Sequence, residues 1–284
     1  SPSAPLGGTQ AQIDGEVVHG SLHEEWARAG VVFVDSTRGL TEYGELFRPH
    51  FGSVIGRDEN AFTRLNAAVF SGGSFVYVPP GVKLTAPLKC FMHLQGGGSS
   101  QFGRTLIIAE EDAEVTFFEN CTSAARPGAS VHWIDCNLGG RLTMKYPCAL
   151  LEGEGASAEA VSVSVAHSGQ HHDSGAKMFH RAPGTSSTIT SKNVCRGTGH
   201  TQFRGWVDIP ASVHDCRNHT ACDSLLIDST SRTTSIPTIQ VRGRSNSAQH
   251  EASVSKLDAE QLFYMRQRGL PEGTARSLSV NGFI

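Results

Sequence analysis

The sequence predicts a β-rich protein built from short strands, and two observations lead to this prediction. Glycine is abundant, with 31 of 284 residues, whereas aromatic residues make up only 7% of the chain. Together with many short Val/Ile/Thr runs, this composition favours strands joined by tight turns. From about residue 69, strand-like runs recur at a spacing of about ten to fifteen residues, with no long helical stretch between them. That pattern argues against a sheet wound through alternating helices.

The first 68 residues are expected to form a loop and helical segment. Residues 1–20 look loop-like and mobile. HEEWARAG (23–30) predicts a short helix that ends at its glycine, a residue suited to the position after a helix. A second short helix is predicted over 41–51, where a proline stops it.

Residues 69–257 form the predicted β core. In AVSVSVA, Val161, Val163 and Val165 alternate with serines, as in a strand with one buried face. The predicted strands cover 74–78, 104–109, 114–119, 130–134, 141–145, 160–166, 187–191, 201–207, 223–227 and 238–241. Evenly spaced short strands fit a sandwich, a jelly roll or a β-solenoid, and no strict repeat chooses among these.

Residues 258–284 predict a helical hairpin at the end of the chain. Asp258 resembles an N-cap with a glutamine as its N3 partner, and Gly269 ends the first helix. Pro271 then begins a second helix, expected over 271–280. Helices this short are marginal alone, so their apolar residues need the β core or a partner protein as cover.

Charge and motif content exclude several classes of function. The net charge is −3 without a basic block, which gives no support for nucleic-acid binding. No stretch approaches the roughly 18–20 apolar residues of a membrane span. The P-loop pattern GxxxxGK[ST] is absent, and neither GxSxG, HExxH nor GxGxxG occurs in a suitable context.

The number and spacing of the cysteines and histidines limit the kinds of metal site that the chain can form. The seven cysteines are odd in number and form no CxxC pair, which predicts free thiols in a reducing compartment. It also argues against a zinc ribbon or a closed ferredoxin-type cluster. Thirteen histidines allow a cupin-like metalloenzyme, but the absence of HxH weakens that alternative.

Two local motifs have plain structural interpretations. His171, His172 and Asp173 in GQHHDSG could bind a metal, yet a solvated loop between strands is the preferred interpretation. The glycines of HLQGGGSSQFG (93–103) predict a turn between strands rather than a phosphate loop, since no helix follows.

The adjacent pair His250 and Glu251 raises a question of geometry. A regular strand would send neighbouring side chains to opposite faces. If both residues serve one site, the strand must end or bulge here. Cys222 begins a predicted strand upstream, where a surface or interface position competes with the ordinary role of a buried thiol.

Several motifs in a fixed order resemble the SufB/SufD family of iron–sulfur cluster assembly proteins. The similarity covers residues 30–284, and its cysteine-bearing motifs are similar to SufB rather than SufD. The motifs are LNAAVFSGGSFVYVPPGV (65–82), QFGRTLIIAEE (101–111), MKYPCALLEGEG (144–155), GAKMFH (175–180), NHTACDSLLID (218–228), HEASVSK (250–256), EQLFYMRQRGL (260–270) and SVNGFI (279–284).

The resemblance implies a right-handed parallel β-helix with flanking helical segments. It also implies a scaffold rather than an enzyme, which assembles a transient 2Fe–2S or 4Fe–4S cluster and hands it to apo iron–sulfur proteins. The implied partners are a SufC-type ABC ATPase, a SufD paralogue or a second copy of the chain, and a cysteine desulfurase system. The missing P-loop agrees, since ATP hydrolysis then belongs to the ATPase. A need for reduced flavin stays open, and the implied location is the cytoplasm, or the plastid stroma in a plant or alga.

The resemblance also assigns roles to individual residues. Cys121 in FFENCTSA would receive persulfide sulfur. Cys222 would take part in cluster formation near a subunit interface, with His250 and Glu251 as cluster or iron ligands. A second arrangement has only one of these two as a ligand while the other orients it. The terminal hairpin would dock the ATPase, through Leu262, Phe263 and Tyr264.

This ligand set suits a scaffold, because thiolate binds iron–sulfur clusters well while imidazole and carboxylate exchange more easily. The chain departs from the family pattern in the 25 residues that separate Cys121 from Tyr146 and in its stop at Ile284. These departures are expected of a compact variant, an edited sequence or a degenerate paralogue. The alternatives are a SufD-like structural partner, a cupin-like metalloenzyme and a carbohydrate-active β-helix. The last of these needs paired carboxylates beside an aromatic cleft, and no acidic pair stands out.

Overall fold

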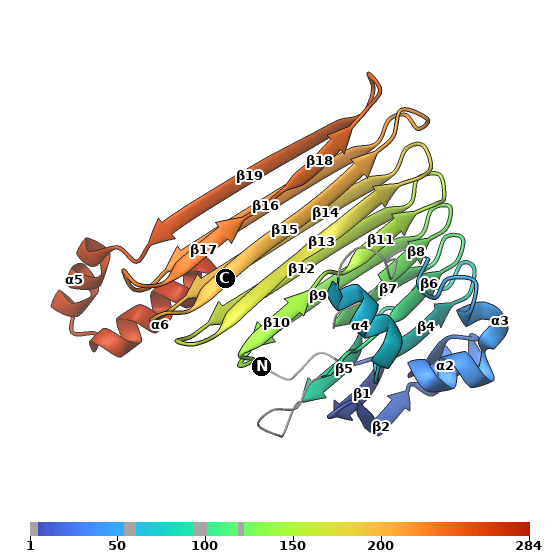
Figure 1. Ribbon diagram of the computed structural model, residues 1–284, viewed down its shortest axis with the longest axis horizontal. Helices are drawn as coiled ribbons and strands as arrows, with labels where there is room; N and C mark the ends of the chain where they lie inside the picture. Colours follow the sequence, from blue (N-terminus) through green and yellow to red (C-terminus); the bar gives the residue numbers. More distant parts are fainter. Residues whose placement is uncertain (1–4, 54–60, 94–100, 119–121) are drawn as a thin grey trace.

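The main body of the protein is a parallel β-solenoid (Figure 1). The computed structural model describes residues 5–53, 61–93, 101–118 and 122–284. From β4 onward the chain passes back and forth between two sheets, so that strands of successive coils pair in parallel, whereas β1 with β2 and β3 with β4 pair antiparallel at the N-terminal end. This confirms the mainly β, solenoid architecture, and it excludes the jelly roll of a cupin, whose strands are antiparallel.

The two sheets are described here as sheet A and sheet B. In spatial order, sheet A contains β19 (Ser247–Lys256), β16 (Arg217–Leu226), β14 (Ser186–Cys195), β12 (Ser157–Ala166), β9 (Ser130–Leu138), β7 (Glu114–Phe118), β5 (Leu88–His93), β1 (Gly8–Ile13) and β2 (Glu16–Leu22). Sheet B contains β17 (Arg232–Ser235), β15 (His200–Ile209), β13 (His171–His180), β11 (Cys148–Leu151), β8 (Thr122–Ala125), β6 (Leu106–Ala109), β4 (Ser74–Val78) and β3 (Val32–Asp35). Two short strands extend sheet B beside these, β10 (Leu142–Lys145) on β13 and β18 (Thr238–Val241) on β15.

Stacked turns keep successive coils in register. Gly155 and Gly184 have φ of 68° and 67°, a conformation that glycine adopts without steric cost. Their N–H groups donate to the carbonyls of Pro183 at 3.1 Å and His214 at 2.9 Å, each in the following coil. The same corner therefore repeats from one coil to the next, and the strands that leave it start at equivalent positions.

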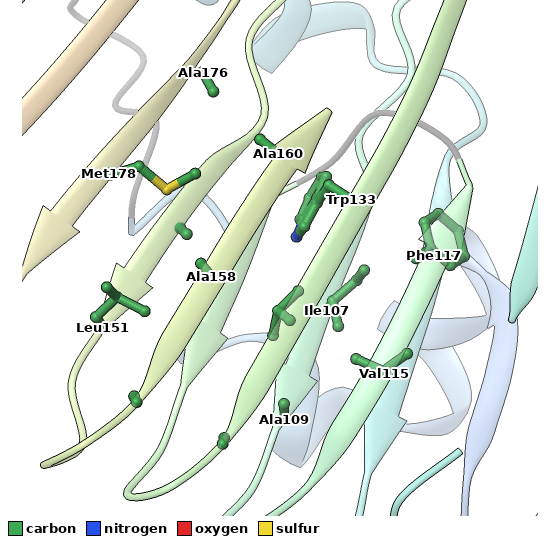
Figure 2. Close-up of a cluster of buried hydrophobic side chains, with 14 of the residues drawn as sticks. Ile107, Ala109, Val115, Phe117, Trp133, Leu151, Ala158, Ala160, Ala176 and Met178 are labelled. Atoms are coloured by element: carbon green, nitrogen blue, oxygen red, sulfur yellow. The ribbon is translucent and has the colours of Figure 1, made fainter. Parts of the chain in front are cut away.

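The hydrophobic core lies between the two sheets. Phe117, Trp133, Leu151 and Met178 project into it from strands of both sheets (Figure 2). Along β12, buried and partly buried residues alternate through the whole strand, as its pattern predicts. The buried face carries the alanines and serines, however, and the valines lie on the partly buried face. A smaller cluster around Phe47 packs the N-terminal helices onto the outside of sheet B.

Helices flank the first coils of the solenoid and lie beyond the tips of its last strands (Figure 1). They are α1 (Glu24–Arg28), α2 (Ser36–Glu42), α3 (Gly44–Phe47) and α4 (Ala61–Val69) near the N-terminus, and α5 (Ala259–Gln267) and α6 (Glu272–Phe283) at the C-terminus. Asp258 caps α5 by accepting a hydrogen bond from the N–H of Glu260 at 2.8 Å, which confirms the predicted start of the hairpin. Within the described residues, no helix is long and apolar enough to cross a membrane.

Four local predictions are wrong, for identifiable reasons. Residues 8–22 are not a loop, because Asp14 and Gly15 form a turn with positive φ that joins β1 to β2. The second helical segment begins at Ser36 instead of 41, because Asp35 caps α2 through the N–H groups of Thr37 and Arg38.

The other two corrections concern polar strands. GQHHDSG runs into β13, where His171 pairs with His200 of β15, so it is not a solvated loop. Cys222 lies in the middle of β16 instead of at its start. The glycine-rich stretch 93–103 lies largely outside the described residues.

We expect the substitution Phe117→Ala to destabilise the protein strongly. Phe117 is fully buried and makes an edge-to-face contact with Phe33, with ring centroids 5.9 Å apart. Removing a buried phenyl ring costs about 3–5 kcal/mol through lost burial and the cavity left behind. The measurement is the midpoint of urea unfolding, with Phe91→Ala as control, since that ring is 51% exposed on the neighbouring strand. Equal shifts for both variants would contradict the assigned core.

Candidate functional site

The candidate site lies at the end of the solenoid formed by β19, β17 and β18, here called the open end. Within the described residues, β16 is the neighbour of β19 on one side and no strand pairs with its other edge. Figure 1 shows β19 as the outermost strand of the stack, with α5 beyond its end. At this end, the outermost strand of the stack is therefore exposed to solvent.

Cys222 points into the solenoid at this end. Its thiol belongs to the buried core cluster, and the residue is 3% exposed. In sheet A it stands in one row with Ser191 of β14 and Ala252 of β19, because the three strands pair in parallel register. Cys222 is thus covered by a single further strand.

Polar groups surround the Cys222 thiol. The side-chain amide of Asn193 lies 3.8 Å from Sγ, and the hydroxyls of Ser235 and Ser191 also form hydrogen bonds with the thiol. Burial nevertheless dominates and raises the pKa of Cys222 to about 11, with a smaller contribution from the adjacent Asp223. The thiol is therefore protonated at neutral pH, and it must lose its proton to bind a metal.

His250 faces the same interior as Cys222. It pairs in register with Thr220, two residues before Cys222, and alternation along β19 places it on the face of Ala252. Its Nε2 atom is buried, and it has no hydrogen-bond partner among the described residues. A buried polar atom without a partner is costly, which is typical of a donor that is completed by a ligand or another chain.

Glu251 lies on the opposite face of β19. Its register partner is Ala221, and its side chain is exposed on the outside of sheet A. β19 pairs with β16 over its whole length without a register shift, so the expected bulge at His250 and Glu251 is not present. Within one molecule, the side chain of His250 therefore faces the interior that contains Cys222, and the side chain of Glu251 does not.

A buried hydrogen-bond network supports this end of the solenoid. His180 bonds to Thr185 at 2.7 Å and to Ser187 at 2.9 Å, and the amide of Asn218 donates to Ser187 at 2.9 Å. The hydroxyl of Thr220 then donates to Asn218 at 3.0 Å. Burial lowers the pKa of His180 to about 4, so the network is uncharged at neutral pH.

The remaining residues singled out from the sequence lie elsewhere. Cys121 is outside the described residues. On α5, Phe263 and Tyr264 are 63% and 59% exposed, whereas Leu262 is partly buried. In the part of the chain that the structure describes, no group of three or more His, Cys, Asp or Glu side chains is placed to hold a metal ion. One chain thus offers a thiol and an imidazole, which is fewer donors than a closed metal site has.

Sequence reasoning missed the groups that contact or cover the thiol. Ser191, Asn193, Ser235 and Ala252 come from three different strands, and only the register of successive coils brings them to Cys222. The sequence feature that could have revealed these groups is the alternation of small polar residues in β14 and β16. It shows that the interior becomes polar towards the open end.

We expect the Cys222 thiol to give the protein a stability that falls at alkaline pH. Its pKa rises from 9.0 to about 11 in the folded state, so folding favours the protonated form. This contribution is complete below pH 9 and is lost as the pH rises through about 11, for a total of about 2–3 kcal/mol. Urea unfolding between these pH values tests it: the wild type should lose stability more steeply than Cys222→Ala. Parallel pH curves would contradict the burial assigned to this thiol.

Comparison with known proteins adds an independent finding. Residues 124–283 match the family model "SUF system FeS cluster assembly, SufBD core domain", and residues 9–90 match "SufBD protein N-terminal region". The chain is 38% identical over 322 aligned positions to the iron–sulfur cluster assembly protein SufB of Bacillus subtilis. The same identity is found with an iron–sulfur cluster assembly SufBD family protein of Staphylococcus epidermidis. Both alignments cover 98% of this chain and 69% of the relative.

The core-domain match spans the strands that carry Cys222 and His250 together with the terminal hairpin. It therefore agrees with the parallel solenoid and with the motifs that carried the resemblance in the sequence. The chain belongs to the SufB/SufD family of iron–sulfur cluster assembly proteins.

Proposed function

We propose that this chain is the SufB-like scaffold on which an iron–sulfur cluster is assembled, with Cys222 and His250 as its first donors to the cluster. The observation that carries the proposal is their shared position. The Cys222 thiol and the unpartnered Nε2 of His250 face one interior on the last two strands of sheet A. In this reading the cluster is cargo, and the chain itself catalyses no turnover.

The donor set fits temporary binding. Thiolate is the usual ligand of iron–sulfur clusters, and imidazole replaces it in some of them. A site with four cysteines holds its cluster, whereas one thiolate and one imidazole leave coordination positions for solvent or for another protein. Release then needs fewer strong bonds to break, as transfer to an apo iron–sulfur protein requires.

A second copy of the chain or a SufD paralogue would complete the site at the open end. The unpaired edge of β19 presents a row of backbone N–H and C=O groups, which a strand from a partner can bind. Apolar side chains are also exposed there, with Val254 at 61%, Ile236 at 39% and Ile239 at 38%. Covering this layer would bury both the strand edge and the apolar residues.

The C-terminal hairpin is the proposed docking surface for a SufC-type ABC ATPase. The exposed rings of Phe263 and Tyr264 are aromatic anchors of the kind that dominate binding at protein interfaces. A cysteine desulfurase system would supply sulfur in the cytoplasm or plastid stroma. The role of Cys121 as the sulfur acceptor and any use of reduced flavin remain predictions from the resemblance.

Two observations favour a second candidate function, that of a SufD-like structural partner. The Cys222 thiol is buried and protonated at neutral pH, and the described residues of one chain supply too few donors for a closed site. A structural partner would use the same open end and hairpin without binding the cluster. Reconstitution with iron and sulfide separates the two candidates.

We expect the wild-type protein to retain a brown, oxygen-sensitive chromophore after anaerobic reconstitution with ferrous iron and sulfide. Cys222→Ala should lose it, because the thiolate ligand that the described residues place at the open end is removed. Iron and sulfide counts after desalting measure the result. Cys136→Ala is the control, since Cys136 is exposed and lies on β9, away from the open end. If Cys222→Ala retained as much iron and sulfide as the wild type, the assigned site would be contradicted. If neither the wild type nor the variants retained iron and sulfide, the result would favour the structural partner.

We expect the double substitution Phe263→Ala/Tyr264→Ala to weaken binding of the organism's SufC-type ATPase by about tenfold or more, because truncating aromatic anchors costs at least 1–2 kcal/mol. Isothermal titration calorimetry measures the change. Leu138→Ala is the matched control, because Leu138 is 66% exposed on β9. If the double variant bound as tightly as this control, the hairpin would not be the docking surface.

A further inference from the structure

Ala252 is the side chain that lies between the Cys222 thiol and the open end. It pairs in register with Cys222, projects to the same face, and belongs to the last strand of sheet A. Cys222 is 3% exposed, whereas Ala252 is exposed. On the opposite sheet, Ser235 of β17 forms a hydrogen bond with the thiol.

The residues that flank Ala252 on its face of β19 are larger. Alternation along the strand places His250 on one side of it and Val254 on the other. These two stack over Thr220 and Ser224, so that the smallest of the three side chains stands over the thiol. The side chain directly over Cys222 is therefore smaller than its two neighbours on this face, and the other alanine of the face, Ala248, stands over Asn218.

The dimensions of the layer show why this matters. Neighbouring strands of a sheet lie about 4.8 Å apart, and a metal–thiolate bond is about 2.3 Å long, as it is for zinc. A metal ion bonded to Cys222 from the open end would thus lie within the layer that the side chain of residue 252 occupies. A methyl group leaves space beside it, whereas a branched side chain would fill that space.

Strand propensity does not account for this alanine. Alanine is depleted in β-strands and valine is enriched, so an exposed strand position gains from valine where packing is indifferent. β19 contains valine at 254, two residues further along the same face. Alanine also stands at 248 on the same face, over Asn218, so it is the register with Cys222 that singles out Ala252.

We propose that Ala252 sets access to Cys222 from the open end, and that its small side chain admits a metal ion or other small reactant to the thiol. The metal cargo rests on the function proposed above. The access itself is a property of this chain alone, and a reagent that is not iron can measure it.

The test measures alkylation of Cys222 by iodoacetamide in the folded protein. The Cys222 peptide is quantified by mass spectrometry, with the buried Cys195 as internal reference. Ala252→Val should slow alkylation of Cys222 by about tenfold, because added methyl groups occupy the approach to Sγ. Ala252→Gly should be alkylated at least as fast as the wild type. Ala248→Val is the matched control, since this residue lies on the same face of β19 but over Asn218.

Two outcomes would overturn the inference. One is an unchanged rate for Ala252→Val. The other is an equal slowing in Ala248→Val, which would mean that valine merely stabilises the strand edge. Thermal unfolding of both variants checks that the fold is kept. If the wild type retained no iron and sulfide while Ala252→Val still slowed alkylation, the proposed function would fail and the access role would stand.

Discussion

The parallel register between successive coils is the constraint on which the rest of this structure depends. The strands β12, β14, β16 and β19 of sheet A pair residue for residue, each with the strand one coil away, and stacked turns hold that alignment at the corners. A side chain's neighbours are therefore set by positions about one coil apart in sequence. Ser191, Cys222 and Ala252 form one such row, and Thr220 and His250 belong to the row beside it.

The same register explains how the Cys222 thiol can be buried from solvent and still lie one strand away from the open end. Inside the solenoid, burial keeps the Cys222 proton on sulfur, which makes the thiol a poor nucleophile and a poor ligand in the isolated chain. At the last coil, one strand separates it from the open end, where His250 offers an uncompensated nitrogen. A partner that covers the open end could complete the donor set, and movement of that partner would break it. In the proposed function, binding and release of the cluster would thereby be coupled to assembly with that partner.

Regular strands and capped helices could be predicted from local sequence. The alternation in AVSVSVA and the apolar run at 74–78 marked β12 and β4, and the Asp258 cap marked α5. The polar strands β1 and β13 could not be predicted in this way, because they are specified by pairing with strands of other coils. In the candidate site too, one part could be predicted from the sequence and another part required the structure. The family resemblance identified Cys222, His250 and Glu251, but only the unbroken register of β19 shows that Glu251 faces outward.

The central claim is that Cys222 and His250 face one interior and bind one cluster. The most direct measurement is pulsed electron paramagnetic resonance of the reduced, reconstituted protein, which detects nitrogen bonded to a paramagnetic cluster. The account predicts a strongly coupled histidine nitrogen in the wild type and in Glu251→Ala, and its loss in His250→Ala. A spectrum that His250→Ala leaves unchanged, or nitrogen coupling that is absent from the wild type, would contradict it.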